Sequence, residues 1–211
     1  MAALIPEAAE IASVDGAMRT IAIEDELRVC AHGSVNYGRG WISIWGRPAR
    51  LAQWAERNLG DAKSLRAEEL DAWRIQALRP AIDREITENS NPLELGLSDA
   101  IAPNKGCYPG QEVIEKIISL GAPAKRLGRI EFTDAGGLGA EMKVPAPLFN
   151  LAEPPQEVGQ LTSVTSPGEK TQGLALLKKI HARNDLPVQV GTNSALTDTT
   201  PLRGIVAAIS S

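Results

Sequence analysis

The sequence predicts an α+β protein in two parts: a mixed sheet with helices over residues 1–121 and a small antiparallel β-barrel over residues 122–211. Short strand-like runs come first along the chain, two helical patterns follow, and apolar runs separated by Gly and Pro turns fill the remainder. The 211 residues suffice for one large domain or two small ones. Aromatic residues make up only 4%, so the core must rely on Leu, Ile, Val and Ala.

The first part begins with strand patterns. Strands are predicted over residues 11–14, 19–23, 27–31 and 41–45, with the turn pair Asp15-Gly16 after the first. The last of them alternates, which places Trp41, Ser43 and Trp45 on one side.

Two helices are expected next. Pro48 suits the first turn of a helix over residues 49–59, which Gly60 ends. Ser64 resembles the N-cap of a second helix that Pro80 ends or kinks. The residues expected on one face of that second helix are Leu70, Trp73, Ala77 and Leu78.

Residues 81–104 are predicted to form a long ordered loop, a feature that is often functional. A carboxylate pair for acid–base chemistry is conceivable in this loop, but a solvated acidic segment is the simpler interpretation. The carboxylates concerned are Asp83, Glu85, Glu88 and Glu94. Barrel strands are predicted over residues 127–132, 158–164, 173–180, 188–190 and 204–209.

Composition excludes several classes of protein. The net charge of −4 argues against a generally basic surface for nucleic acid, and the cluster of Lys125, Arg126 and Arg129 is interpreted as a solvated strand edge. Two cysteines, Cys30 and Cys107, make neither a disulfide scaffold nor a zinc ribbon and suit the reduced cytoplasm. No apolar run approaches the roughly 18 residues of a membrane span, and no signal peptide is predicted.

The spacing of Cys30 and His32 could suggest a metal site, but two ligands do not make one, and no metal is predicted. The four Trp residues could stack a flat ligand. Trp73 is the most interesting of them because it lies one turn from Gln76, although packing in the core is the simpler role.

The segment over residues 104–113 carries the most chemical information. Lys105 lies two residues before Cys107, and a nearby ammonium would lower the pKa of the thiol. A helix that begins near Gly110 or Gln111 would direct its positive end at the same sulfur. Gln111 and Glu112 supply groups that could hydrogen-bond a small ligand. The alternative is that Cys107 is an inert, buried residue.

Residues 105–112, K-G-C-Y-P-G-Q-E, resemble the K-G-C-Y-x-G-Q-E signature of the YgfZ-type proteins, which are relatives of the glycine-cleavage aminomethyltransferase. Residues 73–76, W-R-I-Q, are similar to the R-I-E-x-G-x-P segment of that family, and residues 91–94 resemble the loop before its signature. Residues 124–129 resemble the strand that opens its C-terminal barrel. The resemblance runs from about Glu10 to the end and is strongest over residues 104–130.

This resemblance implies a tetrahydrofolate-binding protein that supports assembly or repair of iron–sulfur proteins, including tRNA-modifying enzymes. Cys107 would be the functional thiolate, with Lys105 beside it, and would pass sulfur or a transient cluster or undergo redox exchange. A partner protein would be needed, because one thiolate cannot hold a cluster. By position, the ligand-binding residues would be Trp73, Gln76, Tyr108, Gly110, Gln111, Glu112 and Arg126. Neither nucleic acid nor a membrane is an expected partner.

The sequence departs from the family pattern at three points: Gln76 replaces the folate-contacting glutamate, Leu78 replaces a glycine, and the N-terminal region is short. An amide lacks the carboxylate that would accept charge-assisted hydrogen bonds. An accessory factor is favoured over a folate-dependent, aminomethyltransferase-like one-carbon transferase, because the short N-terminal region would lack the catalytic acid that the family enzyme carries there. A partner-binding paralogue without chemistry is the third possibility.

Overall fold

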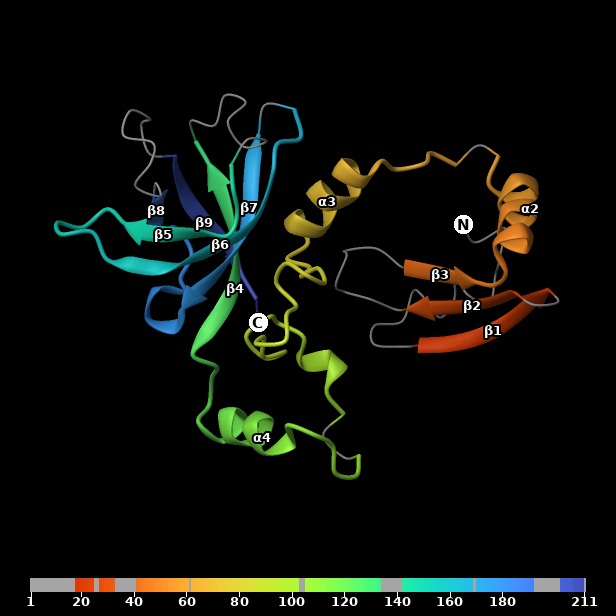
Figure 1. Ribbon diagram of the computed structural model, residues 1–211, viewed down its shortest axis with the longest axis horizontal. Helices are drawn as coiled ribbons and strands as arrows, with labels where there is room; N and C mark the ends of the chain where they lie inside the picture. The colour runs from red at the N-terminus through yellow and green to blue at the C-terminus, as the bar shows by residue number, and fades with distance from the viewer. Residues whose placement is uncertain are drawn as a thin grey trace. The chain divides into compact units, whose positions relative to one another are not determined.

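Figure 1 shows the computed structural model, which describes residues 18–24, 27–32, 41–60, 62–102, 105–133, 142–168, 170–191 and 202–210. The chain divides into two compact units, Met1–Arg66 and Ala67–Ser211, which are described separately. A helix-bearing sheet followed by a closed antiparallel barrel confirms the predicted α+β class. The boundary predicted at residues 121 and 122 stays a prediction. No helix in the described part of the chain is long and apolar enough to cross a membrane.

The first unit contains a three-stranded sheet in the order β1 (Met18–Glu24), β2 (Leu27–His32) and β3 (Trp41–Trp45). These strands match the predicted ones, and each described pair is antiparallel. Cys30 lies opposite Thr20 on one side and Ser43 on the other. The strand predicted over residues 11–14 and its turn lie outside the described residues.

Helix α2 (Pro48–Asn58) forms where the sequence predicts it. Pro48 occupies the first turn, where its missing N–H costs no hydrogen bond, and Arg47 before it is extended. Trp54 is the residue that the helix buries, and the helix ends two residues before Gly60. The first helix is therefore confirmed.

The second unit is built around a closed barrel with the strand order β4-β7-β6-β5-β8-β9. The strands are β4 (Lys125–Phe132), β5 (Ala146–Asn150), β6 (Glu157–Thr165), β7 (Thr171–Lys178), β8 (Pro187–Val190) and β9 (Arg203–Ile209). All neighbouring pairs are antiparallel. Leu148, Leu161 and Leu177 are fully buried in its core. Closure leaves the sheet without a free edge, which removes a site of unwanted strand pairing.

Strand β5 was not predicted, because Pro145 and Pro147 flank and interrupt its apolar run and proline is rare inside sheets. The barrel tolerates Pro147 because its carbonyl still accepts a hydrogen bond from the backbone N–H of Gly191, at 2.8 Å. The run predicted over residues 173–180 is also shorter than expected. Strand β7 ends at Lys178, and the 3-10 turn η4 (Lys179–His181) follows.

Helix α3 (Ala67–Gln76) differs from its prediction. It begins three residues after Ser64 and buries Arg74 and Ile75, whereas Leu70 is 43% exposed. The expected apolar face is therefore wrong. Ile75 packs with Leu127 and Leu174 of the barrel, so contacts with the barrel, rather than helical periodicity, decide which face is buried.

The helix ends before Leu78 because that residue has a φ of 56°, in the left-handed region. This is the position at which the family pattern has glycine. A leucine there costs about 1–2 kcal/mol of backbone strain. The partly buried Leu78 side chain packs against the cluster of Ile75, Leu127 and Leu174, which offsets that cost.

Leu78→Ala is therefore expected to be less stable than Leu78→Gly by about 1 kcal/mol, because alanine loses the packing and keeps the strain. Chemical denaturation of both variants would measure the difference. Ala72→Gly, within α3, is the control and should show the ordinary loss of about 1 kcal/mol for glycine in a helix. A glycine variant less stable than the alanine variant would contradict the strain.

The predicted loop over residues 81–104 is confirmed in its described part. It holds a bridge between Ile82 and Ile86 and the 3-10 turn η2 (Ser98–Ala100). Leu95 is buried, and the Glu94 carbonyl accepts the backbone N–H of Leu127 at 2.9 Å. The loop is thereby fixed to the start of β4.

Candidate functional site

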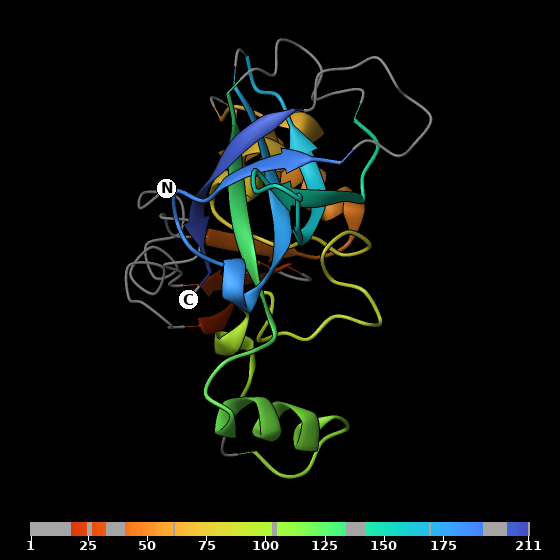
Figure 2. The same ribbon diagram turned by 90° about the vertical axis from the view of Figure 1, so that its left-hand side faces the viewer.

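The signature segment forms a turn that leads into helix α4 (Gln111–Ser119), and Figure 2 shows this helix standing apart from the barrel. Gly110 is the N-cap and has a φ of 85°, a conformation that glycine adopts without strain. Cys107 precedes it as an exposed, free cysteine. A reactive thiol needs this exposure, whereas an inert core cysteine would lack it.

Lys105 and Tyr108 lie on either side of Cys107 in the chain and contact each other. The Lys105 ammonium lies 4.6 Å from the centroid of the Tyr108 ring, within the range of a cation–π interaction. This contact holds a positive charge within the turn that carries the thiol. It is a feature that the residue spacing alone did not predict.

A cavity of about 550 Å³ opens beside this turn. Three of the predicted site residues, Lys105, Tyr108 and Gly110, line it. The other lining residues are Glu88, Ser90, Asn91, Pro92, Ala100, Ile101, Ala102, Pro109, Val113 and Ile114. Apolar walls with a few hydrogen-bonding groups are typical of small-molecule sites, whose volumes are roughly 300–1,000 Å³.

The first residues of α4 complete the signature. The Gln111 Nε2 donates to Glu115 Oε1 at 2.6 Å, so this amide is engaged within the helix. Glu112 is exposed in the first turn, where a carboxylate interacts favourably with the helix dipole. Neither residue lines the cavity. Ile114 is the residue that α4 buries, and Val113 is 56% exposed.

The remaining predicted residues lie elsewhere in the second unit. The exposed Gln76 ends α3, and its backbone carbonyl accepts from Arg129 Nη1 at 2.8 Å. Trp73 lies one turn earlier on the same helix. Arg126, on β4, donates from Nη1 to the Ser210 carbonyl at 3.4 Å. None of these three lines the cavity, and neither does Cys107 itself, so the structure does not bring the predicted set together at one place.

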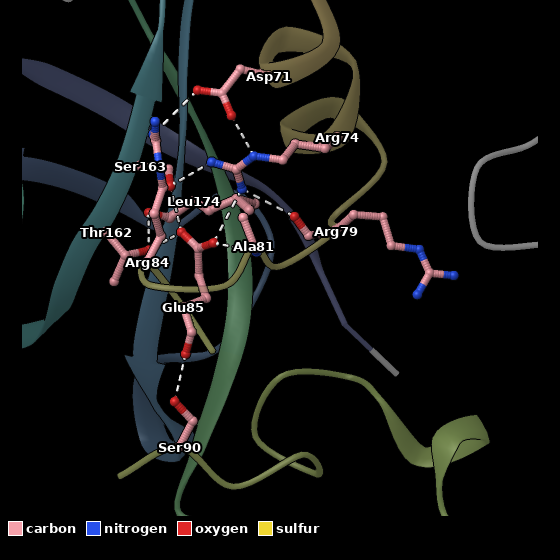
Figure 3. A network of polar contacts seen from close by, with 10 residues as sticks. All are labelled: Asp71, Arg74, Arg79, Ala81, Arg84, Glu85, Ser90, Thr162, Ser163 and Leu174. Atoms are coloured by element: carbon pink, nitrogen blue, oxygen red, sulfur yellow. Dashed lines mark hydrogen bonds and ion pairs between the residues drawn. The ribbon is translucent and has the colours of Figure 1, made fainter. Parts of the chain in front are cut away.

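A buried ion-pair network joins α3 and the loop to the barrel, as Figure 3 shows. Arg74 Nη1 donates to Glu85 Oε2 at 3.1 Å, and Arg74 Nη2 donates to Ser163 Oγ at 2.8 Å. The other carboxylate oxygen of Glu85 accepts from Thr162 Oγ1 at 2.7 Å and from Ser163 Oγ at 2.5 Å. Asp71 pairs with Arg74 Nε and, at 3.2 Å, with the partly exposed Arg84.

Glu85 is only 1% exposed, so its expected place in a solvated acidic loop is wrong. Its burial is compensated by the paired guanidinium and by hydrogen bonds to both oxygens. No local pattern indicates this burial, because the partners of Glu85 on β6 are 77 and 78 residues away. The network also reaches the cavity wall: Ser90 Oγ donates to the Glu85 carbonyl at 2.6 Å, and Ser90 lines the cavity.

Among the described residues, no three His, Cys, Asp or Glu side chains cluster as a metal site. The side chains of Cys30 and His32, considered above as a metal pair, lie outside the described part of the structure.

The chain is similar to known proteins over somewhat more than half of its length. The chain is 34% identical over 125 residues to the Arabidopsis thaliana protein named "Putative transferase At1g60990, chloroplastic", which covers 57% of this chain and 27% of that protein. It is 32% identical over 114 residues to the aminomethyltransferase of Halalkalibacterium halodurans, and the match covers 53% of this chain and 29% of that protein. For the aminomethyltransferase of Bacillus cytotoxicus the identity is 30% over 123 residues, and the match covers 57% of this chain and 31% of that protein. No protein-family model matches the chain.

The fold is also that of a known structure. The crystal structure of the glycine cleavage system aminomethyltransferase T from Bartonella henselae superposes with a TM-score of 0.70 at 15% identity. The superposition covers 90% of this chain and 51% of that one. The chain is thus aminomethyltransferase-like in sequence and fold, and it matches less than a third of the length of the sequence relatives named above.

Proposed function

We propose that this protein is a folate-binding accessory factor for the assembly or repair of iron–sulfur clusters in other proteins, with Cys107 as its reactive group. The observation that carries the proposal is the exposed Cys107 within a turn whose neighbouring residues, Lys105 and Tyr108, line a cavity of about 550 Å³. When the chain neighbours of an exposed thiol line a ligand-sized cavity, a small molecule bound there can control access to the sulfur.

The cavity suits a ligand such as tetrahydrofolate in size and chemistry. Tyr108 offers an aromatic face, Pro92 and Ile101 offer apolar walls, and Asn91 and Lys105 offer hydrogen-bonding groups. Gln76 and Trp73 are not part of this wall, so they would contribute to folate binding only through a second surface. We therefore assign the cavity residues the primary role.

For Cys107, the proposed chemistry begins with the thiolate, the form of cysteine that attacks sulfur and binds iron. A single thiolate cannot hold a cluster, so the acceptor protein must supply the other ligands. Because Cys107 is exposed, an acceptor protein can reach its thiol. Tetrahydrofolate would act here by occupying the neighbouring cavity.

The test is the alkylation rate of Cys107 by iodoacetamide as a function of pH, in a Cys30→Ala background with and without tetrahydrofolate. A bound folate that shields the thiol should slow alkylation about tenfold when folate is present at about ten times its Kd. Cys107→Ser serves as the blank for label incorporation. An alkylation rate that tetrahydrofolate leaves unchanged at all concentrations would remove folate from the proposal, and a thiol no more reactive than a free cysteine would remove the thiolate mechanism.

The second candidate is a folate-dependent one-carbon transferase, favoured by the names of the Halalkalibacterium and Bacillus relatives. Formation of methylenetetrahydrofolate from an aminomethyl donor by this chain alone would support it. The third candidate, a paralogue without chemistry, would be supported by a buried Cys107, and the exposure of Cys107 argues against it.

A further inference from the structure

Several basic residues lie near an exposed isoleucine in the backbone at one end of the barrel. Lys125 begins β4 and lies directly opposite Lys178, the last residue of β7. The chain then turns through η4, where Ile180 is 81% exposed. The backbone N–H of Lys179 donates to the Ala124 carbonyl at 2.9 Å, which holds η4 beside the start of β4, as Figure 2 shows. Lys125, Lys179, Ile180 and Arg183 together are called the basic patch.

Among the described residues, the lysine next to the basic patch is paired with a carboxylate, whereas the cations of the patch itself are not. Lys178 is neutralised by Glu157, whose carboxylate lies 3.1 Å from Nζ. In the described part of the chain, no ion pair is found for Lys125, Lys179 or Arg183. Asp185, two residues after Arg183, is an exposed carboxylate. One anion against the three cations of the patch still leaves an excess of positive charge.

The positive charge is local, because the chain as a whole carries a net charge of −4. A surface of this sign attracts acidic groups and repels basic ones. Ile180, 81% exposed, offers an apolar contact within the patch. Apolar residues inside a charged rim are typical of protein interfaces.

We propose that the basic patch docks an acidic surface of a partner protein that places an apolar side chain against Ile180. Nucleic acid fits less well, because none of the four patch residues is aromatic and three cations are few against the roughly 6–10 phosphate contacts of many DNA-binding proteins. The patch lies outside the cavity beside Cys107, so the proposal goes beyond the proposed function and can fail separately from it.

The test uses a fluorescein-labelled synthetic peptide rich in Glu and Asp with one central Leu, and the full chain, in fluorescence anisotropy. Lys125→Glu combined with Lys179→Glu is expected to weaken binding about tenfold, and the effect should shrink as salt screens the charges. Ile180→Ser should weaken the binding of the peptide that contains Leu. It should leave unchanged the binding of a second peptide in which Ser replaces that Leu.

The matched control combines Lys143→Glu with Lys170→Glu, two exposed lysines outside the patch. An equal loss in the control would show general electrostatic attraction and overturn the proposal, as would the absence of peptide binding. Tighter binding of bulk tRNA, or of phosphatidylglycerol vesicles, through the same lysines would overturn the choice of a protein partner. Circular dichroism and the Cys107 alkylation rate should be unchanged in every variant, which separates loss of docking from misfolding and from failure of the proposed function.

Discussion

Replacing Glu85 by alanine is expected to lower the free energy of unfolding of the unit Ala67–Ser211 by about 3–5 kcal/mol. The substitution leaves the guanidinium of Arg74, only 8% exposed, without its buried counter-charge. It also removes the acceptor for the Ser163 hydroxyl and for the backbone N–H of Ala81, whereas the Thr162 hydroxyl keeps the Leu174 carbonyl as an acceptor. Denaturant unfolding followed by circular dichroism measures the loss.

The control for this prediction is Arg84→Ala, which removes an ion pair to Asp71 from a side chain that is 45% exposed. Such an exposed pair contributes at most about 1 kcal/mol. Replacing Arg74 and Glu85 together by apolar residues of similar size should cost less than the sum of the single changes, because no unpaired charge stays behind. If Glu85→Ala and Arg84→Ala cost the same, Glu85 is not buried with Arg74 in solution.

The same network links fold stability to the candidate site. Glu85 is fixed to β6 through its carboxylate, and its backbone carbonyl holds Ser90 at the cavity wall. Loss of the carboxylate should therefore loosen the cavity before the barrel itself unfolds, since the loop has fewer buried contacts than the strands. Protection of Cys107 by tetrahydrofolate reports this local change.

Local chemistry explains what could be predicted from the sequence. Pro48 and Gly60 mark the limits of α2, and the glycines around Cys107 predict the turn that precedes α4. In each case the residues that decide the conformation lie within a few positions of it. The position of Cys107 before a helix was therefore predictable from the sequence, whereas its exposure was one of two alternatives that the sequence left open.

Features that depend on distant partners were not predictable. Arg74 meets Ser163, 89 residues further along the chain, so helical periodicity could not reveal that this charged residue is buried. The same holds for the cavity, which joins the loop near Ser90 to the turn at Tyr108. Sequence resemblance grouped Gln76 with the signature, but in the structure Gln76 ends α3 and does not line that cavity.

Replacing Gly159 by alanine is expected to cost at least about 3 kcal/mol, the upper part of the range for overpacking. Gly159 lies on β6 opposite Leu177 of β7. A Cβ there would overlap the Leu176 carbonyl oxygen and lie 2.9 Å from the Leu177 Cα. These are backbone atoms of a paired strand in a closed barrel, so they cannot move aside without breaking the ladder.

Two further glycines provide a graded control for this prediction. At Gly128 a Cβ would meet the Cδ1 atoms of Leu177 at 2.7 Å and of Ile209 at 3.0 Å, which are ends of flexible side chains. Alanine at Gly128 should therefore cost less, about 1–2 kcal/mol, because these side chains can change rotamer. Alanine at Gly106, where no atom lies within 4 Å, should be nearly neutral. Urea denaturation should give the largest loss of stability for alanine at Gly159, a smaller loss at Gly128 and almost none at Gly106. A small loss at Gly159 would mean that the backbones of β6 and β7 are not packed this closely.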